Sequence, residues 1–238
     1  MANRIVSEVR QALIDNADEK TRVGSDRYHK PGQAPKVHGV RMGIVSRIAR
    51  ESQKEIKSLS KQEIFALCEE LWQSAYVEEA VVACAWAESL HKQYEPADFK
   101  VFEHWVQNYL TNWADCDTLC NHPIGNFVMM YPNYISELKK WAKSDKHLVR
   151  RAAAVTLIIP ARKGLFLNDI FEIADILLLD KEDLVQKGYG WMLKAASEAH
   201  LQEVFNYVIS KKTVMPRTAF RYALEKMPAE MRAEAMRK

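Results

Sequence analysis

The sequence has only four cysteines and no long apolar run, and each of these features excludes some classes of protein. No apolar stretch approaches the roughly 18 residues that a membrane span requires. The N-terminal segment, residues 1–20, is charged throughout and has no apolar signal core. The four cysteines form no Cys-x-x-Cys pair and no compact disulfide framework, so reduced thiols are expected. We therefore expect a cytosolic protein.

Motifs that hold cofactors or metals are also missing. There is no phosphate-binding loop, dinucleotide fingerprint or nucleophile elbow. Cys116, Cys120 and His122 lie close together, but a closed zinc site needs four ligands and no second pair stands at a suitable spacing. The other histidines are scattered and form no helical ligand pair. We therefore expect no metal and no cofactor.

Helical periodicity runs through nearly the whole chain. With 238 residues and 48% apolar composition, the chain can bury a large core. Apolar residues recur at helical spacing over 5–13 and 64–71, and no stretch shows a convincing β alternation. Prolines separate the segments. The predicted helices lie near residues 41–52, 76–91, 97–110, 113–120, 132–143, 146–159, 168–179, 183–196, 200–210 and 216–225. The aromatic residues within 99–109 have helical spacing and are interpreted as core. The fold class is all-α.

A weak internal repeat indicates how the helices are arranged. Val77-Glu-Glu-Ala80, Val149-Arg-Arg-Ala152 and Val185-Gln-Lys-Gly188 start 72 and 36 residues apart, and each has a small fourth residue. Small residues let neighbouring helices approach closely. The spacing suits HEAT-like repeats, which stack into a solenoid with an extended concave face. We predict one solenoid domain over residues 1–238.

The charges are segregated along the chain. Residues 18–57 have ten Lys or Arg against five Asp or Glu (+5), residues 61–120 have three against eleven (−8), and residues 121–164 have eight against two (+6). Two basic blocks around an acidic one predict a polarised surface that suits a polyanion. Chance clustering on solvated faces is the alternative. In the polar connection 26–41, Tyr28, Lys30, Lys36 and Arg41 are placed to follow a phosphate backbone, unless this is an ordinary loop.

Four residues with chemically suggestive side chains stand at intervals of 4, 34 and 40 residues: Trp113, Asp117, Arg151 and Trp191. The first interval places Trp113 and Asp117 one turn apart on one helix face. The longer intervals are about one repeat each. If the stacked repeats bring these residues to one face, two indoles, a carboxylate and a guanidinium there would suit a cationic ring attached to a phosphodiester. Taken singly, each residue has a simpler role: the tryptophans in packing, Asp117 paired with a lysine, and Arg151 in an ion-pair network with Arg150 facing outward.

In order along the chain, several motifs resemble those of the bacterial AlkD-like DNA alkylation repair glycosylases. They are Tyr28-His-Lys, Gly39-Val-Arg, Glu70-Leu-Trp72, Asn112-Trp-Ala-Asp-Cys-Asp117, Ser144-Asp145, Val149-Arg-Arg-Ala-Ala153 and Val185-Gln-Lys-Gly-Tyr-Gly-Trp-Met-Leu193. The resemblance runs from about residue 5 to about residue 225. It implies a right-handed solenoid of HEAT-like repeats whose concave face cradles duplex DNA in the bacterial cytosol. The implied activity is removal of N3- and N7-alkylated purines by a monomer, with no metal or cofactor.

The resemblance also implies roles for individual residues. Asp117 matches the catalytic carboxylate, Trp113 and Trp191 match aromatic residues that face the lesion, Arg151 matches an arginine on the DNA backbone, and Tyr28 matches a tyrosine near the same surface.

The sequence departs from the family pattern at three places. Asn112 stands where a second tryptophan can precede Trp113. Lys194 replaces an arginine one turn beyond Trp191 and is expected to contact phosphate. The loop 29–38 is rich in proline.

The chemistry of alkylated purines agrees with this set of residues. Alkylation at N3 or N7 leaves the purine cationic, so the base departs with little acid help. A carboxylate such as Asp117 would stabilise the oxocarbenium-like charge on deoxyribose and position water. Two other functions stay open from the residues: a non-enzymatic adaptor that binds a protein, and a DNA-structure binder without catalysis. Salt-dependent binding to duplex DNA is expected of the glycosylase and of the DNA-structure binder, but not of the adaptor.

Overall fold

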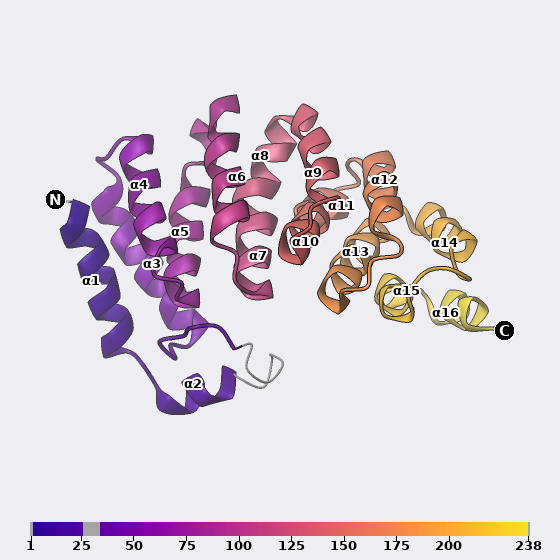
Figure 1. Cartoon of the computed structure of the whole chain (residues 1–238), viewed down its shortest axis with the longest axis horizontal. Coiled ribbons are helices and arrows are strands. Elements are labelled where there is room, and N and C mark those ends of the chain that lie inside the picture. The colour runs from indigo at the N-terminus through magenta and orange to yellow at the C-terminus, as the bar shows by residue number, and fades with distance from the viewer. Residues whose placement is uncertain (1, 26–33, 238) are drawn as a thin grey trace. The chain divides into compact units, whose positions relative to one another are not determined.

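The computed structural model describes residues 2–25 and 34–237, and this part of the chain is helical, as the sequence predicts (Figure 1). Beyond helices and turns, the described residues contain only an isolated β-bridge between Lys36 and Tyr76. None of the described helices is long and apolar enough to cross a membrane. The helices form two compact units, residues 1–119 and 120–238.

The first unit contains two layers of helices. Helices α1, α3, α5 and α7 contact one another in succession, and α4 packs on α1, α5 and α6. Short 3₁₀ turns at His91–Gln93 and Pro96–Asp98 lead into α6. The bounds are α1 Ala2–Asp15, α2 Glu19–Ser25, α3 Met42–Ile56, α4 Lys61–Trp72, α5 Val77–Ser89, α6 Phe99–Asn108 and α7 Trp113–Leu119.

The second unit also contains helices in two layers. Helices α10, α13 and α15 contact one another in succession, while α9, α12 and α14 pack on their flanks. This alternation of helices is the packing expected of helical repeats. The bounds are α8 Gly125–Met130, α9 Ile135–Trp141, α10 His147–Val155, α11 Ile158–Arg162, α12 Leu167–Leu177, α13 Asp183–Ala196, α14 Leu201–Ser210, α15 Arg217–Leu224 and α16 Ala229–Met236.

Aromatic side chains fill the core of the first unit. Phe102 and Trp105 of α6 are fully buried, and Phe65 of α4 meets both edge-on at centroid distances of 5.9 and 5.8 Å. Edge-to-face contacts of this kind add to the free energy of apolar burial. Phe99 is buried as well, which confirms the interpretation of this aromatic stretch as core. Tyr109 is half-buried, and its hydroxyl donates to Glu69.

The small residues of the sequence repeat, Ala80, Ala152 and Gly188, are all buried. Gly188 lies against Arg151 and Val155 of α10, where the absence of a side chain permits close packing. Two of the three helices begin slightly before their repeat motif. Helix α5 begins at Val77, but α10 and α13 begin two residues before their repeat valines, because extended residues at 146 and 182 precede them.

Some helices differ from the predicted ones. The predicted helix over 146–159 is two helices, α10 and α11, separated by a turn at Thr156 and Leu157. Residues 120–124 form one π-helical turn that contains Pro123, whose missing N–H cannot continue an ordinary helix. The short helices α2, α8 and α16 were not predicted from periodicity, because each is too short to show a clear apolar stripe.

Candidate functional site

Helix α7 carries two of the predicted site residues on one face. Trp113 and Asp117 are both half-buried, whereas Cys116 and Leu119 on the same helix are fully buried. Residues four apart lie one above the other on a helix, so the indole and the carboxylate are neighbours. The structure therefore brings Trp113 and Asp117 together, as their spacing predicts.

A buried polar cap fixes the start of α7. Asn112 is 5% exposed, and its Oδ1 accepts hydrogen bonds from the backbone N–H groups of Ala114 (2.8 Å) and Asp115 (3.1 Å). The Asn112 amide donates in turn to Asp115 Oδ2 at 2.6 Å. These bonds satisfy N–H groups that a helix N-terminus otherwise leaves without partners. Asn112, which departs from the family pattern, is therefore a capping residue in this chain.

Asp115 is the most unusual group in this cap. Its Oδ2 accepts from Asn112 and from the Thr111 hydroxyl at 2.9 Å, but its Oδ1 is buried and has no hydrogen-bond partner in the described part of the chain. Burial raises the pKa of Asp115 to about 6, although the hydrogen bonds from Thr111 and Asn112 act in the opposite direction. A buried acceptor without a partner costs roughly 1–3 kcal/mol. Sequence reasoning missed this residue.

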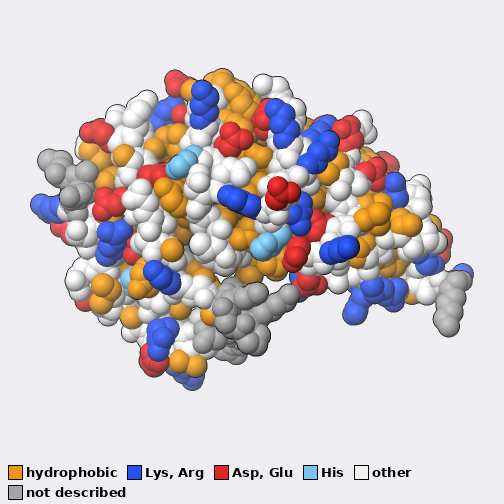
Figure 2. Space-filling view, viewed as in Figure 1, with side chains coloured by type: hydrophobic (Ala, Val, Ile, Leu, Met, Phe, Trp, Pro, Cys, Tyr) orange, Lys and Arg blue, Asp and Glu red, His pale blue; other side chains and the backbone are white. Residues whose placement is uncertain are grey.

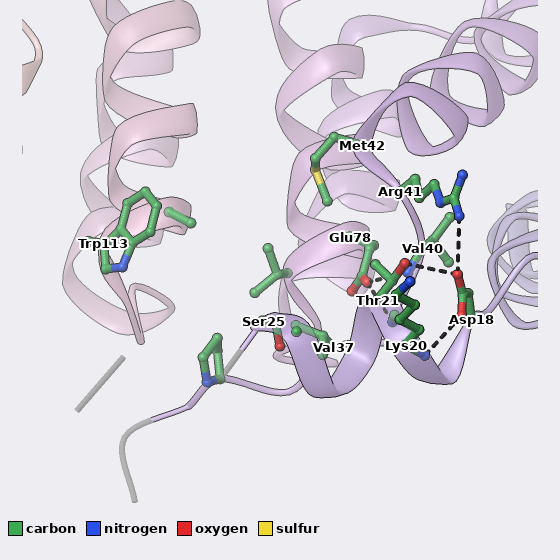
Figure 3. A pocket seen from close by; sticks show the side chains of 15 residues that line it. Asp18, Lys20, Thr21, Ser25, Val37, Val40, Arg41, Met42, Glu78 and Trp113 are labelled. Atoms are coloured by element: carbon green, nitrogen blue, oxygen red, sulfur yellow. Dashed lines mark hydrogen bonds and ion pairs between the residues drawn. The ribbon is translucent and has the colours of Figure 1, made fainter. Parts of the chain in front are cut away.

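The first unit also contains a pocket of about 500 Å³ with Trp113 on its wall (Figure 3). In the close-up, the indole on α7 faces Met42, Val37 and the residues around Glu78 across the open space. The wall is mainly apolar, and Arg41 and Asp18 form an ion pair at 3.5 Å on it. Sequence reasoning singled out Arg41 but not the pocket, because residues far apart in sequence build it.

A buried carboxylate holds one wall of this pocket in place. Glu78, which is 2% exposed, accepts hydrogen bonds from the backbone N–H groups of Gly39 (2.8 Å), Val40 (3.1 Å) and His38 (3.0 Å). Gly39 has a φ of +88°, and a Cβ at this position would lie 2.7 Å from the Cβ of Arg22. The conformation and the space both require glycine here. This accounts for the glycine of the Gly39-Val-Arg motif.

The neighbouring residue Glu79 ties the same segment to α1. Its carboxylate lies 3.1 Å from His38 Nε2 and 2.9 Å from Arg10 Nε. The His38 ring stacks on Tyr76 at a centroid distance of 3.9 Å. The start of α5 thus organises the described part of the polar connection through two buried acidic side chains.

In the second unit, Arg151 lies in the contact between α10 and α13. The residue is 5% exposed, and its Nη1 donates to the carbonyl oxygen of Leu184 at 2.5 Å. A Cβ at Gly188 would lie 3.3 Å from Arg151 Cγ. The absence of a side chain at Gly188 therefore leaves space for the arginine. The Gln-Lys-Gly motif and the Arg-Ala-Ala motif are parts of one contact.

Trp191 and Lys194 follow on α13. Trp191 is half-buried. Lys194 Nζ lies 3.0 Å from a carboxylate oxygen of Glu225 and 5.5 Å from the ring centroid of Tyr222. A Cβ at Gly190 would lie only 2.7 Å from Tyr222 Cβ, so the second glycine of the motif permits close packing of α13 on α15.

Arg150 is more exposed than Arg151, as expected, but its side chain is held by an ion pair and by backbone carbonyl groups. Its Nε lies 2.5 Å from Asp180 Oδ2, and its Nη1 donates to the carbonyl oxygens of Ser144 and Asp145. Asp180 is 8% exposed, so the pair is largely shielded from solvent. Arg150 is a structural residue that holds the start of α10. Its bonds to residues 144 and 145 reach backbone carbonyl oxygens, so they do not depend on which side chains stand there.

The predicted site residues thus fall into two groups. Trp113 and Asp117 share α7 in the first unit, while Arg151, Trp191 and Lys194 lie on α10 and α13 in the second. Tyr28 lies outside the described residues. All four cysteines are buried and none forms a disulfide, and the described residues contain no group of side chains that suits a metal ion.

Local ion pairs offset part of the charge segregation seen in the sequence. In the basic segment 121–164, Lys139 pairs with Asp169 and Glu172, and Lys140 pairs with Glu137. Figure 2 shows acidic and basic side chains interspersed over much of the face in view, with a group of basic side chains over α15. The polarised surface stays a prediction.

Comparison with known proteins identifies the family. Residues 9–227 match the sequence pattern of the DNA alkylation repair enzymes. The chain belongs to this family. No curated protein sequence matches it significantly. Among solved structures, a protein from Enterococcus faecalis described as a predicted DNA alkylation repair enzyme superposes with a TM-score of 0.77 and 17% sequence identity. The match covers 90% of this chain and 98% of that one, so the two proteins share a fold.

Proposed function

We propose that the protein is a monofunctional DNA glycosylase that hydrolyses the N-glycosidic bond of cationic N3- and N7-alkylated purines in duplex DNA. The observation that carries the proposal is the pairing of Trp113 and Asp117 on α7, in a chain of the DNA alkylation repair family. Both side chains are half-buried, which leaves them partly accessible to a substrate. The proposal makes Asp117 the catalytic residue.

The cationic purine is already a good leaving group, so the main barrier is the charge that develops on deoxyribose. When the glycosidic bond breaks, its electron pair leaves with the base and neutralises the alkylated ring. The Asp117 carboxylate stabilises the oxocarbenium-like sugar and orients a water molecule. The water oxygen bonds to the anomeric carbon, and the proton that it loses passes to the solvent. No metal or cofactor takes part.

The remaining residues bind the substrate in this proposal. Trp113 and Trp191 contact the cationic lesion, since cation–π attraction at a desolvated ring is worth about 2 kcal/mol. Arg151 and Lys194 bind phosphate, and Tyr28 contacts the same DNA. Arg151 is buried against α13, which would hold its guanidinium in one orientation and limit the entropy lost on binding.

The test is release of 3-methyladenine and 7-methylguanine from methylated duplex DNA, followed by chromatography of the free bases. We expect both bases to appear, with abasic strands that break only after alkali treatment. Strand breaks without alkali would contradict a monofunctional enzyme. No released base with duplex still bound would indicate a DNA-structure binder, and loss of both would indicate a protein-binding adaptor.

A further inference from the structure

The start of α7 contains a buried carboxyl group that the reaction at Asp117 does not use. Asp115 lies two residues before Asp117 and is 5% exposed. Its carboxyl is bound on one oxygen only, by the Asn112 amide, the Thr111 hydroxyl and, at 3.4 Å, the Thr111 backbone N–H. The other oxygen has no partner within the described ranges. A smaller or apolar residue would avoid the burial of this group, so burial alone does not explain an aspartate here.

The length of α7 makes this cap unusually important. The helix has only seven residues, and the chain passes directly from it into the π-helical turn at 120–124. So short a helix has little stability of its own and depends on its caps and its packing. In the first unit α7 packs on α5 through its buried face. The cap therefore determines where the helix begins and which way Trp113 and Asp117 point.

We propose that Asp115 is a positioning residue for the reaction at Asp117, through the hydrogen bonds with Thr111 and Asn112 that fix the first turn of α7. This inference rests on the proposed glycosylase function. The Asp115 carboxyl binds the two residues that precede the helix, and Asn112 binds the first turn in return. The closed set of bonds holds the indole at the first helical position and the carboxylate one turn later.

The test compares Asp115→Ala with Asp115→Asn in single-turnover release of 7-methylguanine, with duplex affinity measured in parallel. The alanine variant cannot accept any of these hydrogen bonds, so we expect its rate to fall about 10-fold or more while the Kd stays within about 2-fold. Small misplacements of a reacting group are costly. Asparagine keeps an acceptor oxygen, so the Asp115→Asn rate should stay within about 3-fold of wild type.

Ser60→Ala is the matched control. Ser60 caps α4 in the same unit through a capping box with Glu63, and α4 carries no proposed site residue. Loss of this cap lowers the melting temperature but should leave the rate unchanged. If both alanine variants lose rate in proportion to their melting temperatures, general destabilisation explains the effect and the inference fails.

A second variant keeps the inference testable if Asp115→Ala does not fold. Thr111 is exposed, and Thr111→Val removes the hydroxyl that donates to Asp115 and accepts from the Asn112 amide, while the backbone of Thr111 is unchanged. We expect a loss of about 3-fold in rate and faster hydrogen exchange at the amides of residues 113–119, with other helices unchanged. If hydrogen exchange at these amides and the rate of base release in Thr111→Val both equal those of wild type, the inference is overturned. Faster exchange in a protein whose wild type releases no base would instead overturn the proposed function and leave the positioning of α7 supported.

Discussion

Helices α7 and α13 carry four of the proposed site residues, Trp113 and Asp117 on the first and Trp191 and Lys194 on the second, and different forces hold the two helices. Helix α7 has seven residues, and a network of buried polar groups fixes its start. Helix α13 has fourteen residues and packs through Gly188 and Gly190 against Arg151 and α15. Hydrogen bonds thus position the first group, and close contact between helices positions the second. The two should respond differently to mutation.

Removal of the Glu78 carboxylate should be the most damaging change in the first unit. Glu78→Ala leaves three backbone N–H groups of the pocket wall without their acceptor, and we expect the free energy of unfolding to fall by about 4 kcal/mol. Urea denaturation measures the change. Glu78→Gln keeps an acceptor oxygen and should lose less than half as much; equal losses in the two variants would mean that the backbone bonds do not hold this wall.

Overpacking should be the most damaging change in the second unit. A Cβ at Gly190 would approach the backbone oxygen of Ala219 to 2.9 Å, so Gly190→Val forces α13 and α15 apart and should cost about 3 kcal/mol of unfolding free energy. Gly43 is the control, because a Cβ there meets nothing within 4 Å. Gly43→Ala should change stability by less than about 1 kcal/mol. A tolerated valine at position 190 would disprove close packing as the force that holds α13.

Asp115 should give the first unit an unusual dependence on pH. Its pKa is raised to about 6 in the fold, so between about pH 4 and pH 6 the folded protein binds more protons than the unfolded chain. Stability from this group is therefore present at low pH and is lost as pH rises. We expect the unfolding free energy of Asp115→Asn, relative to wild type, to increase by roughly 2 kcal/mol from pH 4 to pH 7. A constant difference would show that burial does not perturb this carboxyl.

The smallest predicted effect lies at the end of α13. Glu225 is more than half exposed and pairs with Lys194. If Lys194 binds phosphate as proposed, Glu225 competes with the phosphate for the ammonium group. Glu225→Gln should tighten duplex binding about 2- to 3-fold at low salt, and the gain should disappear at high salt. Fluorescence anisotropy across a salt series measures it. Weaker binding would mean that Lys194 serves α15 and not DNA.

The sequence predicts most of the helices, because helix boundaries depend on local signals. The bounds of α13, Asp183–Ala196, agree with the predicted range, and the four-residue spacing of Trp113 and Asp117 is enough to place them on one face. Of the small residues in the repeat, Gly188 lies where α13 packs closely on α10, as the pattern predicts.

The polar contacts were harder to predict, since their partners are distant in sequence or hidden in ordinary patterns. Glu78 resembles any acidic residue in the first turn of a helix, yet it binds a segment about forty residues away. Arg150 and Arg151 are adjacent, and only the packing of α10 shows that Arg150 binds Asp180 while Arg151 enters the contact with α13. Asp115 is inconspicuous until its burial is known.

The most direct test of the account is the single-turnover rate of 7-methylguanine release by wild type and Asp117→Asn, with the duplex Kd measured for both. Asparagine preserves the shape of the side chain but removes the charge that would stabilise the oxocarbenium-like sugar. We predict a loss of about 100-fold or more in rate, with the Kd unchanged within about 2-fold. An Asp117→Asn variant that releases the base as fast as wild type would contradict the proposed role of α7.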